Sequence, residues 1–401
     1  MKPVSARWFA LGVFTLYTTL NYLDRQTLAA LTPQLRGEFR LTNEDIGWLH
    51  SAFYAVYALC APFAGWWIDR VGLTMGASAT IVLWSLAAMA TGWVESYEGL
   101  VVCRLLLGAA EAGGIPAFGK AAAMYLPPSE RALGLGVNQL GLSGGSMLAP
   151  LLAGWVAAMY GWRAAFVAVG AAGFFWAPLW RVAQRRATPL DAVGRGRAAA
   201  RPGEMIRDAR LWGLIAANVL VMTVYSLWTN WTTVFLVQRY GLSQWEANQQ
   251  YAWIPPLCAA GGGIVGGWLS MRWIRAGQGV YAARGRVILW GAAAVLLTIA
   301  VPYMPGPGWA TAMVSLSFFS SVAVSANLYA LPHDLFGAER TAFAVSGITS
   351  GYGLMLVFYS PWVGRLVDQY GFLPVCRISA FLPLLGWLVL RLTTLRRAEA
   401  A

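Results

Sequence analysis

The sequence predicts an all-α membrane protein whose twelve transmembrane helices form two pseudo-symmetric six-helix bundles. Of the 401 residues, 58% are hydrophobic and only 11% are charged, whereas an ordinary soluble domain is about one quarter charged. Apolar runs of membrane-spanning length recur along the chain, and twelve spans of about 20 residues each fit within it. One long charged interruption near the middle divides these runs into six and six.

The predicted spans follow one another with short connections. In the first half they cover residues 8–31, 47–68, 74–94, 100–126, 132–158 and 162–182. In the second half they cover residues 210–237, 247–271, 285–304, 308–331, 340–364 and 371–392. We therefore expect an N-terminal bundle at 1–182, a cytoplasmic connector at 183–209 and a C-terminal bundle at 210–401, with the function performed largely inside the bilayer.

The basic residues predict how the chain is oriented. With the N-terminus in the cytoplasm, twenty of the 29 Lys and Arg residues fall on the cytoplasmic side and six fall outside. Because cytoplasmic loops are enriched in these residues, we expect a multi-pass protein of the inner (plasma) membrane with both termini in the cytoplasm. The net charge of +12 then indicates loops that face anionic lipid rather than a nucleic-acid partner.

The residues of metal and catalytic sites are scarce. The cysteines lie in apolar runs without paired spacing, and two histidines cannot form an ordinary zinc site. No phosphate-binding loop and no Ser/His/Asp arrangement is recognisable. We therefore expect that the protein is not an enzyme and that it has no catalytic residue, metal site or cofactor.

The two halves resemble each other at corresponding places. Tyr160-Gly161-Trp162, near the end of the fifth span, has a counterpart in Tyr370-Gly371-Phe372 near the end of the eleventh. Gly65-Trp66-Trp67 similarly matches Gly267-Trp268-Leu269. Together these matches predict a duplicated six-helix unit with a cavity between the halves, which is typical of secondary transporters.

Four ionisable residues lie far from the ends of their predicted spans: Asp24, Arg25, Arg104 and Glu111. A charge at such depth costs about 3 kcal/mol or more, so it needs a function or a partner. Arg104 and Glu111 are seven residues apart and share one helix face. Asp24 and Arg25 are adjacent, so they point about 100° apart and cannot both face one partner.

These charges favour a transporter of anions. A guanidinium group matches a carboxylate at two points, which assigns Arg25 and Arg104 to an anionic substrate. The carboxyl groups of Asp24 and Glu111 are then left to bind and release protons. The alternative is a pair of buried salt bridges that only fix helix packing.

Polar-tipped aromatic and amide side chains occur in the same spans. A sugar-like ligand needs both hydrogen-bonding groups and flat apolar faces, although each such residue could equally serve packing or the membrane interface. The set comprises Tyr22, Tyr54, Tyr57, Asn138, Gln139, Tyr225, Trp228, Asn230, Trp231, Ser325, Asn327 and Tyr329.

The segment GWWIDRVG, at residues 65–72, resembles the signature of the major facilitator superfamily between helices 2 and 3. This resemblance implies the major facilitator fold and a cytoplasmic conformational latch formed by Asp69 and Arg70 with Arg131. The sequence departs from the signature at Leu73-Thr74, where a basic pair usually follows.

Longer segments resemble the anion:cation symporter family, which includes bacterial hexuronate and galactonate transporters, sialin and the vesicular glutamate transporters. They are NYLDRQTLAAL (21–31), RLLLGAAEAGGIPAFGKAAAMYLPPSERA (104–132), YGWRAAFVAVGAAGFFW (160–176), AWIPPLCAAGGGIVGGWLS (252–270) and ALPHDLFGAERTAFA (330–344). The resemblance implies proton-coupled symport of a small organic anion by alternating access.

When the family's motifs are matched residue by residue, Asp24 and Glu111 fall on the carboxyl groups that bind protons in the family. Arg25 and Arg104 fall on the arginines that contact its substrate. The expected pocket residues are Tyr22 and Tyr57, Asn138 and Gln139, Tyr225 and Trp228, and Ser325 and Asn327. Helix 11, with SGITSGYGLMLVFYSP, lacks the asparagines common in members that carry sugar acids. We expect a monomer in the lipid bilayer that carries a hexuronate or an aldonate.

One pattern favours a different function. Gly136, Gly145, Ala149-Pro150 and Gly154 echo the glycine–proline motif of drug/proton antiporters, although closely packed small residues are its plain interpretation. Efflux of a drug or metabolite is therefore the alternative to import of a sugar acid. A membrane enzyme or receptor is a third class, which no motif supports.

Overall fold

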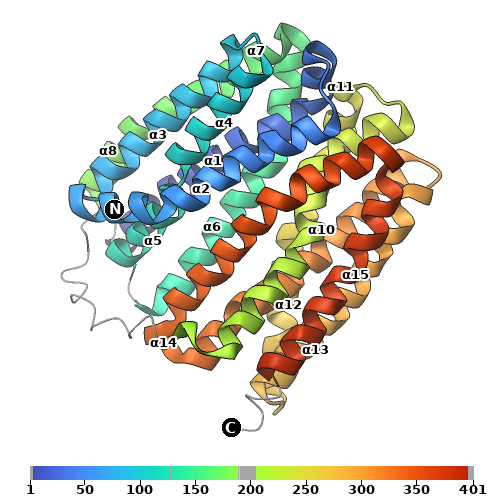
Figure 1. The fold of residues 1–401 in the computed structure, drawn as a ribbon. Helices are drawn as coiled ribbons and strands as arrows, with labels where there is room; N and C mark the ends of the chain where they lie inside the picture. Colours follow the sequence, from blue (N-terminus) through green and yellow to red (C-terminus); the bar gives the residue numbers. More distant parts are fainter. Residues whose placement is uncertain (1–2, 127, 188, 190–204, 396–401) are drawn as a thin grey trace. The chain divides into compact units, whose positions relative to one another are not determined.

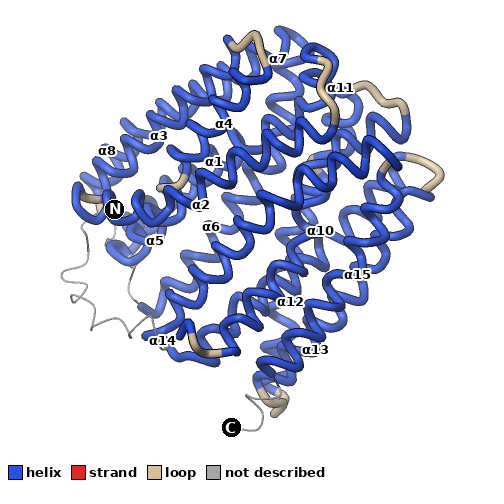
Figure 2. The backbone as a smooth tube through the Cα atoms, in the orientation of Figure 1, coloured by secondary structure: helices blue, strands red, loops and turns tan. Residues whose placement is uncertain are grey.

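The computed structural model describes residues 3–126, 128–187, 189 and 205–395, and this part of the chain is helical with no strand (Figure 2). The predicted all-α class is thus confirmed. Two compact units are present. The first comprises Met1–Gly196 and Gly241–Trp253, and the second comprises Arg197–Tyr240 and Ile254–Ala401.

The first unit contains the helices that hold the six predicted N-terminal spans (Figure 1). They are α1 (Pro3–Phe39), α2 (Asn43–Val71), α3 (Leu73–Ala90), α4 (Tyr97–Glu111), α5 (Gly114–Tyr125), α6 (Pro128–Leu148), the π-helix η2 (Ala149–Ala153), α7 (Gly154–Ala172) and α8 (Trp176–Arg186). It also contains α11 (Gln244–Glu246) and the π-helix η4 (Ala247–Ala252), which lie in the segment Gly241–Trp253.

The second unit holds the remaining helices. They are α10 (Ala209–Tyr240), α12 (Ile254–Arg275), α13 (Val280–Val295) with the 3₁₀ turn η5 (Leu296–Tyr303), α14 (Pro307–Tyr370), α15 (Phe372–Leu390) and the π-helix η6 (Arg391–Leu395). Its core packs α10, α13, α14 and α15 through fully buried aliphatic side chains, among them Leu214, Ile288, Leu328, Ile348 and Leu390.

Eight helical stretches in the described part of the chain are long and apolar enough to cross a membrane. The predicted span 162–182 and most of the predicted span 132–158 fall within one of them, Val137–Arg186. Gly161, with φ +85°, separates two helices inside this stretch. The predicted spans 308–331 and 340–364 both fall in α14, which is helical throughout. The spans 8–31 and 47–68 lie in α1 and α2, outside the eight stretches.

The duplication predicted from the sequence has a counterpart in backbone geometry. Gly161 and Gly371, which occupy matching positions in the two halves, both adopt positive φ angles, +85° and +71°, a conformation that glycine adopts readily. Thr42 and Ser243, which precede the second and eighth predicted spans, both form a capping box with an acidic residue three positions later. The same local signals therefore begin corresponding helices in each half.

The segment Gly241–Trp253 packs within the first unit through buried amides. Asn248, which is fully buried, donates from Nδ2 to the Ala30 carbonyl at 2.9 Å. Gln249 donates from Nε2 to the Leu151 carbonyl of η2 at 2.7 Å. A Cβ atom at Gly154 would lie 3.0 Å from the Asn248 amide, so glycine permits this close approach. Sequence patterning had assigned this segment to the second half.

Aromatic side chains form the core of the first unit. Tyr17 contacts Trp84 with ring centroids 4.6 Å apart, and Phe14 contacts Trp180 at 4.5 Å. The Trp176 indole donates to the Val13 carbonyl at 2.6 Å. Aromatic rings of this size bury a large apolar area. These contacts pack α1, which also carries Asp24 and Arg25, against α3 and α8.

Candidate functional site

The four charged residues predicted within the membrane are buried together in the first unit. Asp24 and Arg25 lie on α1, and Arg104 and Glu111 lie on α4. Asp24 is 2% exposed, Arg104 is 3% exposed and Glu111 is fully buried, and the side chain of Arg25 is 10% exposed. Adjacent helical residues point about 100° apart: Arg25 bonds to Glu111, whereas Asp24 interacts with Arg104 and also with Glu111.

Arg25 forms a buried ion pair with Glu111. Its Nε and Nη2 atoms donate to Glu111 Oε2 at 3.1 and 2.9 Å, and Nη2 also donates to Asn21 Oδ1 at 3.3 Å. Glu111 Oε1 has no hydrogen-bond partner among the described residues. Removing one partner of such a pair costs about 3–5 kcal/mol, because the other charge stays buried. Binding and release of a proton by Glu111 would therefore change how tightly Arg25 is held.

Four aromatic rings surround the guanidinium group of Arg25. Its Cζ atom lies 4.8 Å from the centroids of Tyr22 and Phe53, 4.9 Å from Tyr57 and 5.9 Å from Tyr54. A cation over aromatic faces is stabilised by about 0.5–2 kcal/mol. The predicted pocket residues Tyr22 and Tyr57 thus meet at Arg25. Phe53 was missed, although its position four residues before Tyr57 puts both on one face of α2.

Asp24 and Arg104 form the second half of the charged cluster. Neither carboxylate oxygen of Asp24 has a hydrogen-bond partner of normal geometry in the described chain, and the same holds for Arg104 Nη2. Asp24 lies close enough to Arg104, Glu111 and the Trp84 indole for electrostatic interaction. Buried polar atoms are rarely left unsatisfied, so this half of the cluster has hydrogen-bonding capacity for a proton or an anionic ligand.

Two further polar residues border this cluster. His50, on α2, is 5% exposed and interacts electrostatically with Arg104. Asn21, one turn before Arg25, is 5% exposed and accepts the hydrogen bond from Arg25. Sequence reasoning assigned neither of them to the site. The sequence could have identified them, because His50 and Asn21 are polar residues within predicted spans and Asn21 precedes Arg25 by a single helical turn.

The helices meet at the site because glycines permit close approach. Glu111 is the last residue of α4, and α5 begins at Gly114, so the helix is interrupted beside the charged cluster. A Cβ atom at Gly108 would lie 2.4 Å from the carbonyl oxygen of Phe53. Only glycine allows α4, which carries Glu111, to pack this tightly on α2.

We expect Gly108→Ala to destabilise the protein by about 1–3 kcal/mol, because a rigid backbone atom blocks the added methyl group. Gly119→Ala on α5 is the matched control, since a Cβ atom there meets nothing within 4 Å. Thermal melting of the purified variants in detergent measures the difference. Equal melting temperatures for the two variants would contradict the close α2–α4 packing.

The predicted residues of the fifth span differ in their surroundings. Asn138 Oδ1 accepts a hydrogen bond from the Thr18 hydroxyl at 2.6 Å, whereas Gln139 is exposed. A Cβ atom at Gly145 would lie 2.3 Å from the Thr19 carbonyl. Packing of α6 on α1 therefore accounts for Gly145, which the sequence had placed in an antiporter-like motif. The surroundings of Gly136 lie outside the described part of the structure.

The predicted site residues of the second unit are buried or half-buried. Tyr225 stacks on Phe318 with ring centroids 4.8 Å apart, and Trp228 is 2% exposed. Ser325 is half-buried. The side-chain amide of Asn327 donates to the Gly266 and Ala323 carbonyls, each at 3.0 Å. Asn327 thus joins α12 to α14, and only its Oδ1 atom has no partner within the described chain.

The proposed latch is only partly described. The side chains of Asp69 and Arg131 lie outside the described residues. Arg70 is exposed, with its guanidinium group 5.6 Å from the Trp66 ring. At the end of α2, the Lys120 ammonium group donates to the Ile68 carbonyl at 3.0 Å. This contact was not predicted, and it ties α5 to the negative end of the α2 dipole.

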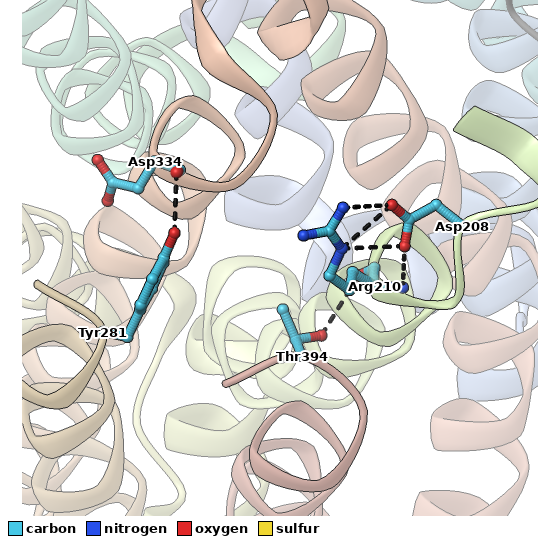
Figure 3. Close-up of polar contacts among 5 residues, drawn as sticks. All are labelled: Asp208, Arg210, Tyr281, Asp334 and Thr394. Atoms are coloured by element: carbon cyan, nitrogen blue, oxygen red, sulfur yellow. Dashed lines mark hydrogen bonds and ion pairs between the residues drawn. The ribbon is translucent and has the colours of Figure 1, made fainter. Parts of the chain in front are cut away.

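The second unit has charged and polar contacts at the starts of α10 and α13. Figure 3 shows the Tyr281 hydroxyl donating to the Asp334 backbone carbonyl, at 2.9 Å, and Arg210 paired with Asp208. The carboxylate of Asp334 also pairs with Arg284 at 2.6 Å. The two contacts of Asp334 fix the start of α13 to α14, and sequence reasoning identified neither these contacts nor the Arg210–Asp208 pair.

Transmembrane helices around a buried cluster of two arginines and two carboxylates define a multi-pass membrane transporter. The model of the Major Facilitator Superfamily matches residues 14–360, and the chain belongs to this family. It is a transporter and not an enzyme, and the predicted major facilitator fold is confirmed.

Curated relatives cover nearly the whole chain. The Hexuronate transporter of Escherichia coli (strain K12) is 31% identical over 410 residues, covering 97% of this chain and 94% of that protein. The D-galactonate transporter of Escherichia coli O6:H1 is 26% identical, covering 96% and 95%. The crystal structure of a bacterial homolog of the human lysosomal transporter Spinster, inward-facing and occupied, has a TM-score of 0.77 at 21% identity, covering 98% and 96%. That structure supports the fold alone.

Proposed function

We propose that the protein is a proton-coupled symporter of a small sugar acid in the inner membrane. The observation that carries this proposal is the buried cluster of Arg25, Arg104, Asp24 and Glu111 in the first unit. The named substrates of the relatives support the chemical class, because hexuronates and galactonate are hydroxylated carboxylic acids. Both termini lie in the cytoplasm, the protein acts as a monomer, and a proton is its coupling ion.

Arg25 offers a site that a substrate carboxylate and Glu111 would share. Its Nε and Nη2 atoms present two donors on one edge, both directed at Glu111 Oε2, and this edge fits an incoming carboxylate at two points. A proton on Glu111 removes the charge that holds Arg25. The substrate then takes the place of Glu111, and the net charge of the buried cluster stays low throughout.

Asp24 and Arg104 offer an alternative to this pair. A proton on Asp24 in place of Glu111 leaves Arg104 with an uncompensated charge, which the single carboxylate of the substrate neutralises. Because an unpaired buried charge is costly, substrate and proton together lower the cost of closing the site. Rocking of the two halves then exposes the substrate to the other side of the membrane.

The aromatic rings around Arg25 suit the rest of a sugar acid. Tyr22 and Tyr57 supply flat faces and hydroxyl groups, and Asn21 supplies an amide. A ligand of this kind binds through a few placed polar groups on apolar walls. Efflux of amphipathic compounds is the less supported function, since the glycine at position 145 is explained by helix packing.

The binding step is tested by thermal shift of the detergent-purified protein. We expect a hexuronate or aldonate at saturating concentration to raise the melting temperature, because a ligand at about 100 times its Kd stabilises the native state by about 2.7 kcal/mol. Matched neutral sugars should have no effect, since they lack the carboxylate. Stabilisation only by neutral or cationic amphiphiles would contradict this proposal and favour efflux.

A further inference from the structure

The turn between α12 and α13 gathers four arginines with little compensating charge. Arg272 and Arg275 lie in the last turn of α12, and Arg284 and Arg286 lie near the start of α13. Gly277, with φ +89°, reverses the chain between them. The sequence contains no Asp or Glu between Glu246 and Asp334, so this helix pair has no acidic residue of its own.

Only one of these arginines has an acidic partner within the described chain. Arg284 pairs with the carboxylate of Asp334. Arg272, Arg275 and Arg286 are exposed and form no ion pair with any described residue. Three positive charges therefore remain on one exposed end of the α12–α13 pair.

Tryptophan rings hold two of these arginines in place. The guanidinium group of Arg272 lies 5.4 Å from the Trp268 ring, and that of Arg286 lies 5.3 Å from the Trp273 ring. Trp273 packs edge-on against Trp290 at 5.4 Å, which joins the two helices. Cation–π contacts of this kind attract a guanidinium group to the face of a ring, so these two arginines lie beside the tryptophans.

The exposed surface next to these arginines is apolar and aromatic. Trp268 is 49% exposed, Trp290 is 59% exposed and Met271 is 40% exposed. Tryptophan is enriched at the membrane interface, where its ring sits at headgroup level, and arginine binds phosphate with a planar fork. The combination matches a phospholipid, with an anionic headgroup on the arginines and glycerol esters and acyl chains against the rings.

We propose that the exposed ends of α12 and α13 form a binding site for one anionic phospholipid. Arg272, Arg275 and Arg286 bind its phosphodiester, and Trp268 and Trp290 contact its glycerol and acyl region. The positive-inside rule places this end of the helices in the cytoplasmic leaflet, where anionic headgroups attract clustered arginines. The site is independent of the transported substrate.

Native mass spectrometry of the full-length protein, titrated with dioleoyl phosphatidylglycerol or with dioleoyl phosphatidylcholine, tests this proposal. We expect wild type to retain one phosphatidylglycerol more tightly than phosphatidylcholine. The triple variant Arg272→Gln, Arg275→Gln and Arg286→Gln should bind phosphatidylglycerol at least roughly tenfold more weakly. The matched control replaces Arg181, Arg185 and Arg186 at the end of α8 with Gln, which removes the same charge from exposed positions.

Several results of this titration would overturn the proposed lipid site. Retention of phosphatidylglycerol by the α12–α13 variant at wild-type affinity overturns the proposal, and so does an equal loss in the α8 control. Competition by millimolar inorganic phosphate would show a free-anion site instead. If the triple variant does not fold, Trp268→Leu with Trp290→Leu removes the ring contacts while keeping all charges. An unchanged affinity for phosphatidylglycerol in that variant also overturns the proposal.

Discussion

Replacing Arg104 with alanine should reduce uptake of the sugar acid by roughly 100-fold or more at low substrate concentration. The substitution removes one partner of the charge pair that Arg104 would form with the substrate carboxylate. Such a loss at a buried site costs about 2–5 kcal/mol, and each 1.4 kcal/mol is tenfold in affinity. Arg104 is 3% exposed, and its Nη2 atom has no hydrogen-bond partner among the described residues. Initial rates of labelled substrate uptake into proteoliposomes measure the effect.

Arg163→Ala is the matched control for the loss of one arginine. Arg163, on α7, pairs with Glu38 at 2.5 Å, but its side chain is 43% exposed. An exposed ion pair contributes only about 0–1 kcal/mol, so this variant should transport like wild type. Equal rates for Arg104→Ala and Arg163→Ala would contradict a role of Arg104 in substrate binding.

A folding defect can be separated from a binding defect. Arg104→Lys keeps the positive charge beside Asp24 and so should keep the fold, but it loses the planar fork that fits a carboxylate. We expect normal membrane insertion and melting temperature with a raised KM for uptake. Wild-type KM in Arg104→Lys would mean that Arg104 acts only as a structural counter-charge.

The sequence was sufficient to find the four charged residues, because a charge inside a membrane is expensive and therefore conspicuous. The helical repeat also predicted that Asp24 and Arg25 cannot both face one partner, but in the structure both interact with Glu111. The sequence could not say which carboxylate pairs with which arginine. That depends on how α4 packs against its neighbours, through contacts such as Gly108 against Phe53 of α2, and no spacing along the chain encodes it.

Other features were missed because they arise between segments distant in sequence. The amides of Asn248 and Gln249 bond to backbone carbonyls of α1 and η2. Every residue has a backbone carbonyl, so the sequence cannot show which one an amide will bond to. The amide of Asn327 joins α12 to α14, which the sequence did not predict, and its contact with substrate stays a prediction. Polarity within a span identifies a residue that needs a partner without saying whether that partner is substrate or backbone.

Replacing Glu111 with glutamine should separate substrate exchange from accumulation. Glutamine is neutral like a protonated carboxyl group, so Arg25 stays free to bind substrate, but position 111 can no longer carry a proton. We expect labelled substrate to equilibrate across proteoliposomes at near wild-type rate in counterflow. Under an imposed pH gradient, we expect uphill accumulation to fall to the background of empty liposomes.

Glu38→Gln is the control, because Glu38 lies beyond the predicted span 8–31. Its hydrogen bond from Arg163, together with one from Trp162, lowers the pKa of Glu38 below its usual value of 4.5. A carboxyl group with a lowered pKa contributes stability above its unfolded pKa and loses it only as the pH falls through the folded pKa. Glu38 therefore stays ionised at neutral and mildly acidic pH, and its replacement should leave accumulation intact.

The pH dependence of exchange completes the test of Glu111. If release of a proton from Glu111 re-forms its ion pair with Arg25, wild-type exchange should slow as the pH rises, because the carboxylate competes with substrate for the same two donors. In Glu111→Gln this competition is absent, so exchange should vary much less with pH. Accumulation with a wild-type pH profile in Glu111→Gln would show that Glu111 is not a coupling site and would leave Asp24 as the carboxyl group to test.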